Sequence, residues 1–129
     1  MDEVIKKHDF EYCGKGMHKI TAEKLAQSQG AVFLDLRSDQ EVKALNLDLS
    51  CYGIDVIHIP LHLLPENLDK LPKDRLIVTF CSGGTRSAWA YVYLLSKGYE
   101  KVKWFEGGYS NLLPLFKTGA VYKRTKEEK

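Results

Sequence analysis

The sequence predicts a single α/β domain in which helices cover both faces of a mostly parallel sheet. Short apolar runs, of the kind that form strands covered on both faces, alternate along the chain with segments that have helical patterning. Short connections join them, and this alternation is typical of parallel sheets. The 129 residues, 44% of them hydrophobic, suffice for one core of ordinary size.

Five segments have the character of strands and four have that of helices. The expected strands are residues 17–20, 31–36, 55–59, 76–80 and 101–105. The expected helices are residues 22–29, 39–45, 87–97 and 110–116. Residues 1–16 form an N-terminal lead-in, residues 17–122 form the domain, and residues 123–129 form a charged tail that we expect to be frayed.

Capping residues and prolines set the boundaries in the first half of the chain. Thr21 is a good N-cap for the first helix, and Gly30 is placed to end it. Ser38 and Glu41 match a capping box, in which the hydroxyl and the carboxylate each satisfy a free backbone N–H at the start of the second helix. Pro60 ends the third strand, because proline has no N–H for the sheet, and the proline-limited segment after it forms only short turns.

The best-defined unit is a strand, a loop and a helix in the second half of the chain. The apolar strand at residues 76–80 runs into a glycine-containing loop at residues 81–86, and a helix follows. We expect that helix to face inward with Ala88, Val92 and Leu95. Ligands of parallel sheets bind beyond the carboxyl ends of the strands, and the loop lies at one such end.

Charge and hydropathy exclude several classes of protein. The 19 basic and 17 acidic side chains leave a formal charge of +2, which is smaller than expected for a nucleic-acid-binding protein. No run of about 18 apolar residues is present to span a membrane, and the amino terminus lacks the apolar region of a signal peptide. We therefore expect a soluble, cytoplasmic monomer with neither a nucleic-acid nor a membrane partner.

The loop Cys81-Ser82-Gly83-Gly84-Thr85-Arg86 has the parts that make a thiol reactive. A thiol ionises more easily where backbone N–H dipoles and a helix N-terminus point at its sulfur. The glycines let successive N–H groups turn inward, and Arg86 opens the helix and adds a permanent positive charge. We predict that Cys81 and Arg86 are catalytic. The predicted substrate-binding residues are Ser82, Gly83, Gly84, Thr85, Arg86 and Ser87.

Such a loop can hold a thiolate and then a persulfide anion, and it can steer an anionic donor such as thiosulfate toward the sulfur. In a first half-reaction the Cys81 thiolate takes a sulfane sulfur from the donor. In a second, the persulfide passes that sulfur to a nucleophilic acceptor, so the overall reaction is a covalent double displacement.

Four segments resemble the rhodanese family. They are Phe80-Cys81-Ser82-Gly83-Gly84-Thr85-Arg86-Ser87-Ala88, Phe33-Leu34-Asp35-Leu36-Arg37, Ile59-Pro60-Leu61 and Trp104-Phe105-Glu106-Gly107-Gly108-Tyr109. The first looks like the family's active-site loop, the second like its Asp-x-Arg signature and the last like its paired-glycine segment. The resemblance implies a single-domain sulfurtransferase with a five-stranded parallel sheet, a catalytic Cys81, and thiosulfate or another persulfide carrier, such as a partner protein, as donor.

Two further features concern the surroundings of the loop. Residues 46–58 depart from the Gly-His-Ile-Pro-Gly-Ala stretch that the family often carries. The departure concerns the geometry of this edge of the sheet and any acceptor surface that it forms, and it does not touch the loop. Asp35 and Arg37 lie at the carboxyl end of a predicted strand, beside the loop. We interpret them as supporting residues that hold the frame of the loop, with direct participation in the chemistry as the alternative.

The remaining cysteines and histidines do not form a recognisable metal site. The chain has three widely separated cysteines, Cys13, Cys51 and Cys81, which favours neither a disulfide framework nor a structural zinc site. His58 and His62 have the spacing of helical metal ligands, but Pro60 between them forbids that helix. We expect no metal and no cofactor. Cys13 and Cys51 are interpreted as structural or incidental, the alternative being that one of them resolves the persulfide as a disulfide.

Two other functions stay open on the sequence alone. The first is oxyanion chemistry of the tyrosine-phosphatase or arsenate-reductase kind, which also uses a cysteine, a loop and an arginine. The related phosphatases have five residues between the two, whereas here four lie between Cys81 and Arg86, a tighter ring better suited to one sulfur atom. The second is a non-catalytic rhodanese-like binding module, although such modules usually lack the cysteine.

Overall fold

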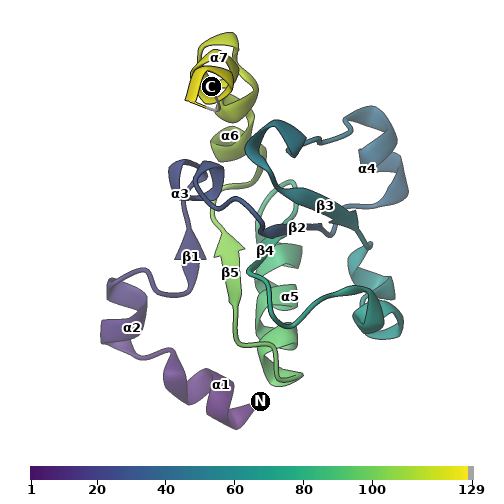
Figure 1. Cartoon of the computed structure of the whole chain (residues 1–129). Coiled ribbons are helices and arrows are strands. Elements are labelled where there is room, and N and C mark those ends of the chain that lie inside the picture. The colour runs from purple at the N-terminus through teal and green to yellow at the C-terminus, as the bar shows by residue number, and fades with distance from the viewer. Residues whose placement is uncertain (128–129) are drawn as a thin grey trace.

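The computed structural model describes residues 1–127 and confirms the predicted α/β fold (Figure 1). All five strands are parallel, and their order across the sheet is β1-β5-β4-β2-β3. The strands are β1 (Lys19–Ile20), β2 (Val32–Asp35), β3 (Asp55–His58), β4 (Ile77–Phe80) and β5 (Val102–Phe105).

Seven α-helices and four short 3₁₀ helices are present in the described residues. The α-helices are α1 (Asp2–Lys7), α2 (Phe10–Gly14), α3 (Ala22–Ala26), α4 (Asp39–Ala44), α5 (Thr85–Ser96), α6 (Gly108–Leu112) and α7 (Thr118–Glu127). The 3₁₀ helices are η1 (Ser50–Tyr52), η2 (Leu61–Leu63), η3 (Pro65–Lys70) and η4 (Leu113–Phe116). None of the helices within residues 1–127 combines the length and the apolar character needed to cross a bilayer.

The N-caps predicted from the sequence are confirmed, whereas α3 ends at Ala26, with Gln27 as its C-cap, and not at Gly30 as predicted. The Thr21 side chain accepts a hydrogen bond from the backbone N–H of Lys24 at the start of α3. Ser38 and Glu41 form the complete capping box of α4. Because these caps satisfy N–H groups that have no partner inside the helix, they fix where both helices begin.

Two hydrophobic clusters, one on each face of the sheet, form the core. One holds Phe33 of β2 together with side chains from α3, η1, α6 and η4. The other holds Val32 and Leu34 of β2 together with side chains from α5, η3 and the ends of β4 and β5. Successive residues of a strand point to opposite faces, so a continuous apolar strand feeds both clusters and requires helices on both sides.

The predicted inward face of α5 is wrong by one position. Its buried residues are Ser87, Ala90, Tyr91 and Leu94, while Ala88, Val92 and Leu95 are only partly buried at its flanks. The rotation of the helix follows from its first turn, where Ser87 is completely buried against the sulfur of Cys81. A stripe at spacings of three, four and seven residues that starts at Ser87 contains the four buried residues.

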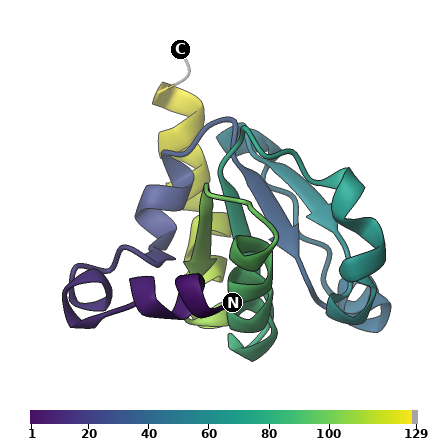
Figure 2. The ribbon, with the colours of Figure 1, turned by 90° about the horizontal axis from the view of Figure 1, so that it is seen from below.

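The ends of the chain are more ordered than predicted. The lead-in contains α1 and α2, and α1 lies beside α5 (Figure 2). His8 Nε2 is 2.7 Å from the Tyr91 hydroxyl. The charged tail is helical as far as Glu127, because α7 continues through it and Arg124 Nε donates to the Cys51 carbonyl at 3.0 Å. Residues 128–129 lie outside the described residues. Both terminal segments depend on such contacts with the domain, which local sequence patterns do not reveal.

Candidate functional site

The loop after β4 places Cys81 between the end of a central strand and the start of α5. Phe80 is the last residue of β4 and pairs with Asp35 at the end of β2, so the loop and the Asp35–Arg37 turn lie side by side. Gly84 has a φ of +114°, a conformation that glycine adopts without strain, and it is the N-cap of α5. The chain thereby turns sharply around the sulfur of Cys81, whose side chain is 1% exposed.

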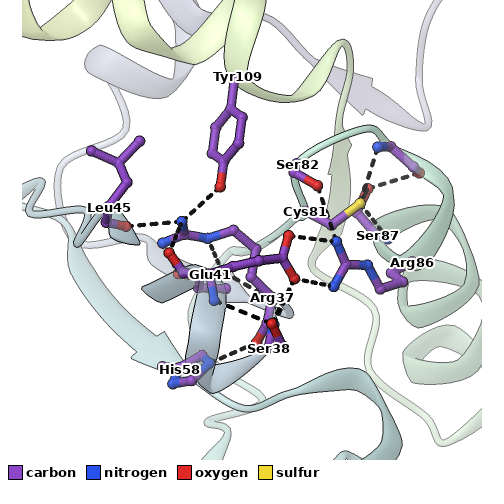
Figure 3. Close-up of polar contacts among 12 residues, drawn as sticks. Arg37, Ser38, Glu41, Leu45, His58, Cys81, Ser82, Arg86, Ser87 and Tyr109 are labelled. Carbon is purple, nitrogen blue, oxygen red and sulfur yellow. Dashed lines mark hydrogen bonds and ion pairs between the residues drawn. The ribbon is translucent and has the colours of Figure 1, made fainter. Parts of the chain in front are cut away.

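Backbone amides point at this sulfur, as the sequence predicts. The N–H of Gly84 donates to Cys81 Sγ at 3.0 Å and the N–H of Ser87 donates at 3.3 Å (Figure 3). Ser87 Oγ lies 3.4 Å from the same atom. These donors hold an anion at the N-terminus of a helix of 12 residues, where the helix dipole also favours negative charge.

The hydrogen bonds outweigh the effect of burial on the thiol. Burial raises the pKa of Cys81, because a buried thiolate loses hydration. The hydrogen bond between Cys81 and the Ser87 side chain lowers it, as do the N–H groups of Ser87, Gly84 and Gly83. The net pKa of Cys81 lies below its ordinary value, so a larger share of the residue is thiolate at neutral pH.

Trp104 is a site residue that the sequence did not reveal. Its indole Nε1 donates to Ser87 Oγ at 3.0 Å and to the Gly84 carbonyl at 3.2 Å. Ser87 Oγ also donates to the Gly84 carbonyl, at 2.9 Å. The serine hydroxyl carries one proton. When the sulfur is anionic, that proton can turn toward Cys81 while Trp104 continues to satisfy the carbonyl.

We therefore expect Ser87→Ala, and to a lesser degree Trp104→Phe, to raise the pKa of Cys81. The midpoint of iodoacetamide alkylation against pH should move up by roughly one unit in Ser87→Ala, the effect of losing one hydrogen bond of about 1.4 kcal/mol. Trp89→Phe is the matched control, because Trp89 lies on the same helix but is 62% exposed. A Trp104→Phe midpoint equal to that of Trp89→Phe would show that the indole does not act on the thiol.

Arg86 has a different environment from the one expected. Its guanidinium donates to both carboxylate oxygens of Glu41, at 2.7 and 2.9 Å, and to Ser82 Oγ at 3.0 Å. The hydrogen bonds with Arg86 hold the pKa of Glu41 far below its usual range, so this carboxylate is charged at any physiological pH. The positive charge expected beside the sulfur is present, but the Glu41 carboxylate forms an ion pair with it. The sequence analysis identified Glu41 only as a capping residue.

Asp35 and Arg37 lie beside the loop, at the carboxyl end of β2. They form a buried ion pair, with Arg37 Nη2 donating to Asp35 Oδ2 at 2.7 Å and Nε donating to Oδ1 at 2.9 Å. Arg37 Nη1 also donates to the Leu45 carbonyl at 2.8 Å and to the Tyr109 hydroxyl at 2.9 Å. Through its contacts with Leu45 and Tyr109, Arg37 ties the end of β2 to the end of α4 and to α6, near the cysteine loop (Figure 3).

The segment after β5 holds the loop from the other side. The N–H of Tyr109 donates to the Ser82 carbonyl at 3.2 Å. Gly108, with a φ of +55°, lies so close that a Cβ atom there would be 2.0 Å from the same carbonyl oxygen. The backbone of the paired-glycine segment therefore packs directly on the backbone of the cysteine loop, which explains the need for glycine at position 108.

The other predicted residues lie at the rim or away from the loop. Gly83 and Thr85 are exposed, and no side chain or backbone would meet a Cβ atom at Gly83. Cys13 lies on α2 and Cys51 in η1, and none of the cysteines in the described residues forms a disulfide.

Comparisons with known proteins agree with this geometry. A family model described as a rhodanese-like domain matches residues 18–113. A sulfurtransferase of Allochromatium vinosum is 31% identical over 87 residues, which cover 67% of this chain and 76% of that protein. The chain spans between 15% and 20% of several tRNA sulfurtransferases that it also matches.

Two solved structures extend the comparison. A rhodanese-like domain protein from Staphylococcus aureus has a TM-score of 0.61 and 28% identity, and the match covers 74% of this chain and 91% of that one. An NAD-dependent persulfide reductase from A. fulgidus has a TM-score of 0.59 and 37% identity, and the match covers 78% of this chain but 17% of that one.

Proposed function

Because this chain belongs to the rhodanese-like family of sulfurtransferases, we propose that it transfers sulfane sulfur through a persulfide on Cys81. The observation that carries the proposal is the set of amides aimed at Cys81 Sγ, with the N–H of Gly84 at 3.0 Å and that of Ser87 at 3.3 Å. These donors stabilise a thiolate before the transfer and a persulfide anion after it.

The first half-reaction conserves electrons and needs no redox partner. The Cys81 thiolate attacks the outer sulfur of the donor, thiosulfate or a persulfide. A new S–S bond forms with the thiolate's electron pair, while the pair of the old S–S bond leaves with sulfite or with the donor thiolate. In the second half-reaction a nucleophilic acceptor, a small molecule or a protein, attacks the outer sulfur and Cys81 leaves as a thiolate.

The burial of Cys81 affects which sulfur atom an acceptor can reach. The thiol side chain is 1% exposed. A persulfide extends it by one S–S bond, about 2 Å, so the sulfur that the acceptor must reach lies farther from the residue's backbone than the thiol does.

The contacts of the loop also weigh against the two rival functions. A phosphatase needs its loop arginine free to hold a phosphoryl group, but Arg86 is engaged by both oxygens of Glu41. A binding module has no need for a thiol whose pKa is lowered by hydrogen bonds from Ser87 and the neighbouring amides against the effect of burial. Sulfur transfer uses the stabilised thiolate and has no phosphoryl group for Arg86 to hold.

Intact mass after incubation with a sulfur donor tests the proposal. We expect the wild-type chain, treated with thiosulfate or with cysteine persulfide, to gain one sulfur atom that cyanide removes. Cys81→Ser should gain none, whereas Cys13→Ser and Cys51→Ser should load like the wild type. A sulfur atom retained on Cys81→Ser, or no loading of the wild type by either donor, would contradict a Cys81 carrier.

A further inference from the structure

We propose that the Glu41–Arg86 ion pair selects the sulfur donor by charge, favouring the persulfide of a thiol over the dianion thiosulfate. The inference rests on the proposed sulfur transfer through Cys81 and adds a class of donor to it. Its basis is that the only arginine in the loop is already neutralised by a fixed carboxylate.

The geometry of the pair neutralises the charge of Arg86 and, together with Ser82, occupies three of its five N–H donors. Nη1 donates to Glu41 Oε1 at 2.7 Å and Nη2 donates to Oε2 at 2.9 Å, a two-point pairing that uses both terminal nitrogens. Nη2 is also 3.0 Å from Ser82 Oγ in the loop. Both side chains are about one-third exposed, so the pair lies at the edge of the loop and not deep in the core.

Glu41 is itself held in place by the start of α4. Its Oε1 atom accepts from the backbone N–H of Ser38 at 3.0 Å and from Ser38 Oγ at 2.9 Å. A carboxylate fixed from both sides cannot move away from Arg86 without losing the cap of α4. An incoming anion therefore meets a pair of near-zero net charge, with a permanent negative charge in it.

No other guanidinium of the site is free to replace Arg86. Arg37 is completely buried and paired with Asp35. The rest of the loop, Ser82 to Thr85, carries no charge and offers only N–H and hydroxyl donors. Such a site suits a single negative charge, that of the Cys81 thiolate or of a persulfide. The N–H groups of Gly84 and Ser87 that donate to Cys81 Sγ are placed to stabilise it.

The two donors differ in the charge that they bring to this site. Thiosulfate carries two negative charges and must approach a thiolate, which places three negative charges near the Glu41 carboxylate. A thiol persulfide carries at most one charge on its sulfur atoms, and none when protonated. Because the Glu41–Arg86 pair brings no net positive charge, the repulsion between the Cys81 thiolate and thiosulfate is not offset, and the barrier is higher for thiosulfate than for the persulfide.

Glu41→Gln tests this proposal without removing the helix cap, because glutamine fills the same place in a capping box. We expect wild-type Cys81 to load faster from cysteine persulfide than from thiosulfate at equal concentrations. In Glu41→Gln, kcat/KM for thiosulfate should rise roughly tenfold, because one charge is removed and Arg86 is released. The value for cysteine persulfide should change little.

Glu100→Gln is the matched control. It makes the same change in net charge at an exposed residue just before β5, at the opposite end of the strand from the loop, and should leave both rates unchanged. Thermal unfolding of both variants reports whether the fold is intact.

Salt dependence gives a second readout that needs no variant. If the Glu41–Arg86 pair offers thiosulfate no net attraction, the wild-type loading rate with thiosulfate should rise as ionic strength increases, because salt screens the repulsion between the thiolate and the donor. A rate that falls with salt would mean that thiosulfate is attracted by Arg86 and would overturn the proposal. An unchanged preference in Glu41→Gln would do the same, whereas failure of both donors to load Cys81 would instead refute the proposed function.

Discussion

Gly108→Ala is expected to disrupt the cysteine loop and destabilise the fold. The added Cβ would lie 2.0 Å from the Ser82 carbonyl oxygen and 2.6 Å from its carbon, so the two backbones must move apart. The left-handed conformation at position 108 adds strain for alanine. Together these effects should lower the free energy of unfolding by about 3 kcal/mol, measured by urea denaturation.

The same change should affect sulfur loading beyond its effect on stability. Displacing Ser82 by even 1 Å moves the loop whose amides hold the Cys81 sulfur, and misplacement of that size costs roughly a hundredfold in rate. Gly83→Ala is the control, because position 83 lacks a positive φ and has nothing within 4 Å of the added carbon. If Gly108→Ala loads and unfolds like Gly83→Ala, the close approach of the two segments is unimportant.

The sequence predicted those parts of the site whose residues are neighbours in the chain. A buried strand, a glycine-containing loop and a helix start lie next to one another in the chain, so Cys81 and its amides followed from their order. Capping at Ser38 followed in the same way, because all partners lie within three residues.

The missing parts are contacts between residues far apart in the chain. Glu41 meets Arg86 across 45 residues and Trp104 meets Ser87 across 17. Nothing in the local pattern of Glu41 distinguishes a capping carboxylate from one that also pairs with an arginine. The carboxyl ends of neighbouring parallel strands meet at one edge of the sheet, and that rule limits the candidate partners without choosing among them.

Short elements without their own periodicity were missed for a related reason. The helices α1 and α2 have six and five residues, too few for stability in isolation. α1 depends on tertiary contacts such as the one between His8 and Tyr91. The face of α5 was also misassigned, because a serine and a tyrosine do not look like core residues until Cys81 and His8 provide their polar partners.

Asp35→Asn is expected to be the most destabilising substitution at the supporting pair. The Asp35 carboxylate accepts from the backbone N–H, Nε and Nη2 of Arg37, and both side chains are at most 2% exposed. Asparagine keeps the shape but loses the charge and turns an amide donor toward a guanidinium. Leaving Arg37 buried without its counter-ion should cost about 3–5 kcal/mol in the free energy of unfolding.

An exposed pair of the same chemistry provides the comparison. Arg75 and Asp55 are 2.9 Å apart but 36% and 73% exposed, so Asp55→Asn should cost less than about 1 kcal/mol. Asp35→Asn should also slow the loading of Cys81, because Arg37 holds the Tyr109 hydroxyl and the Tyr109 N–H holds the Ser82 carbonyl. Equal denaturation midpoints for the two variants would mean that the charge at position 35 is not what keeps Arg37 in the core, and that the frame of the loop depends on packing alone.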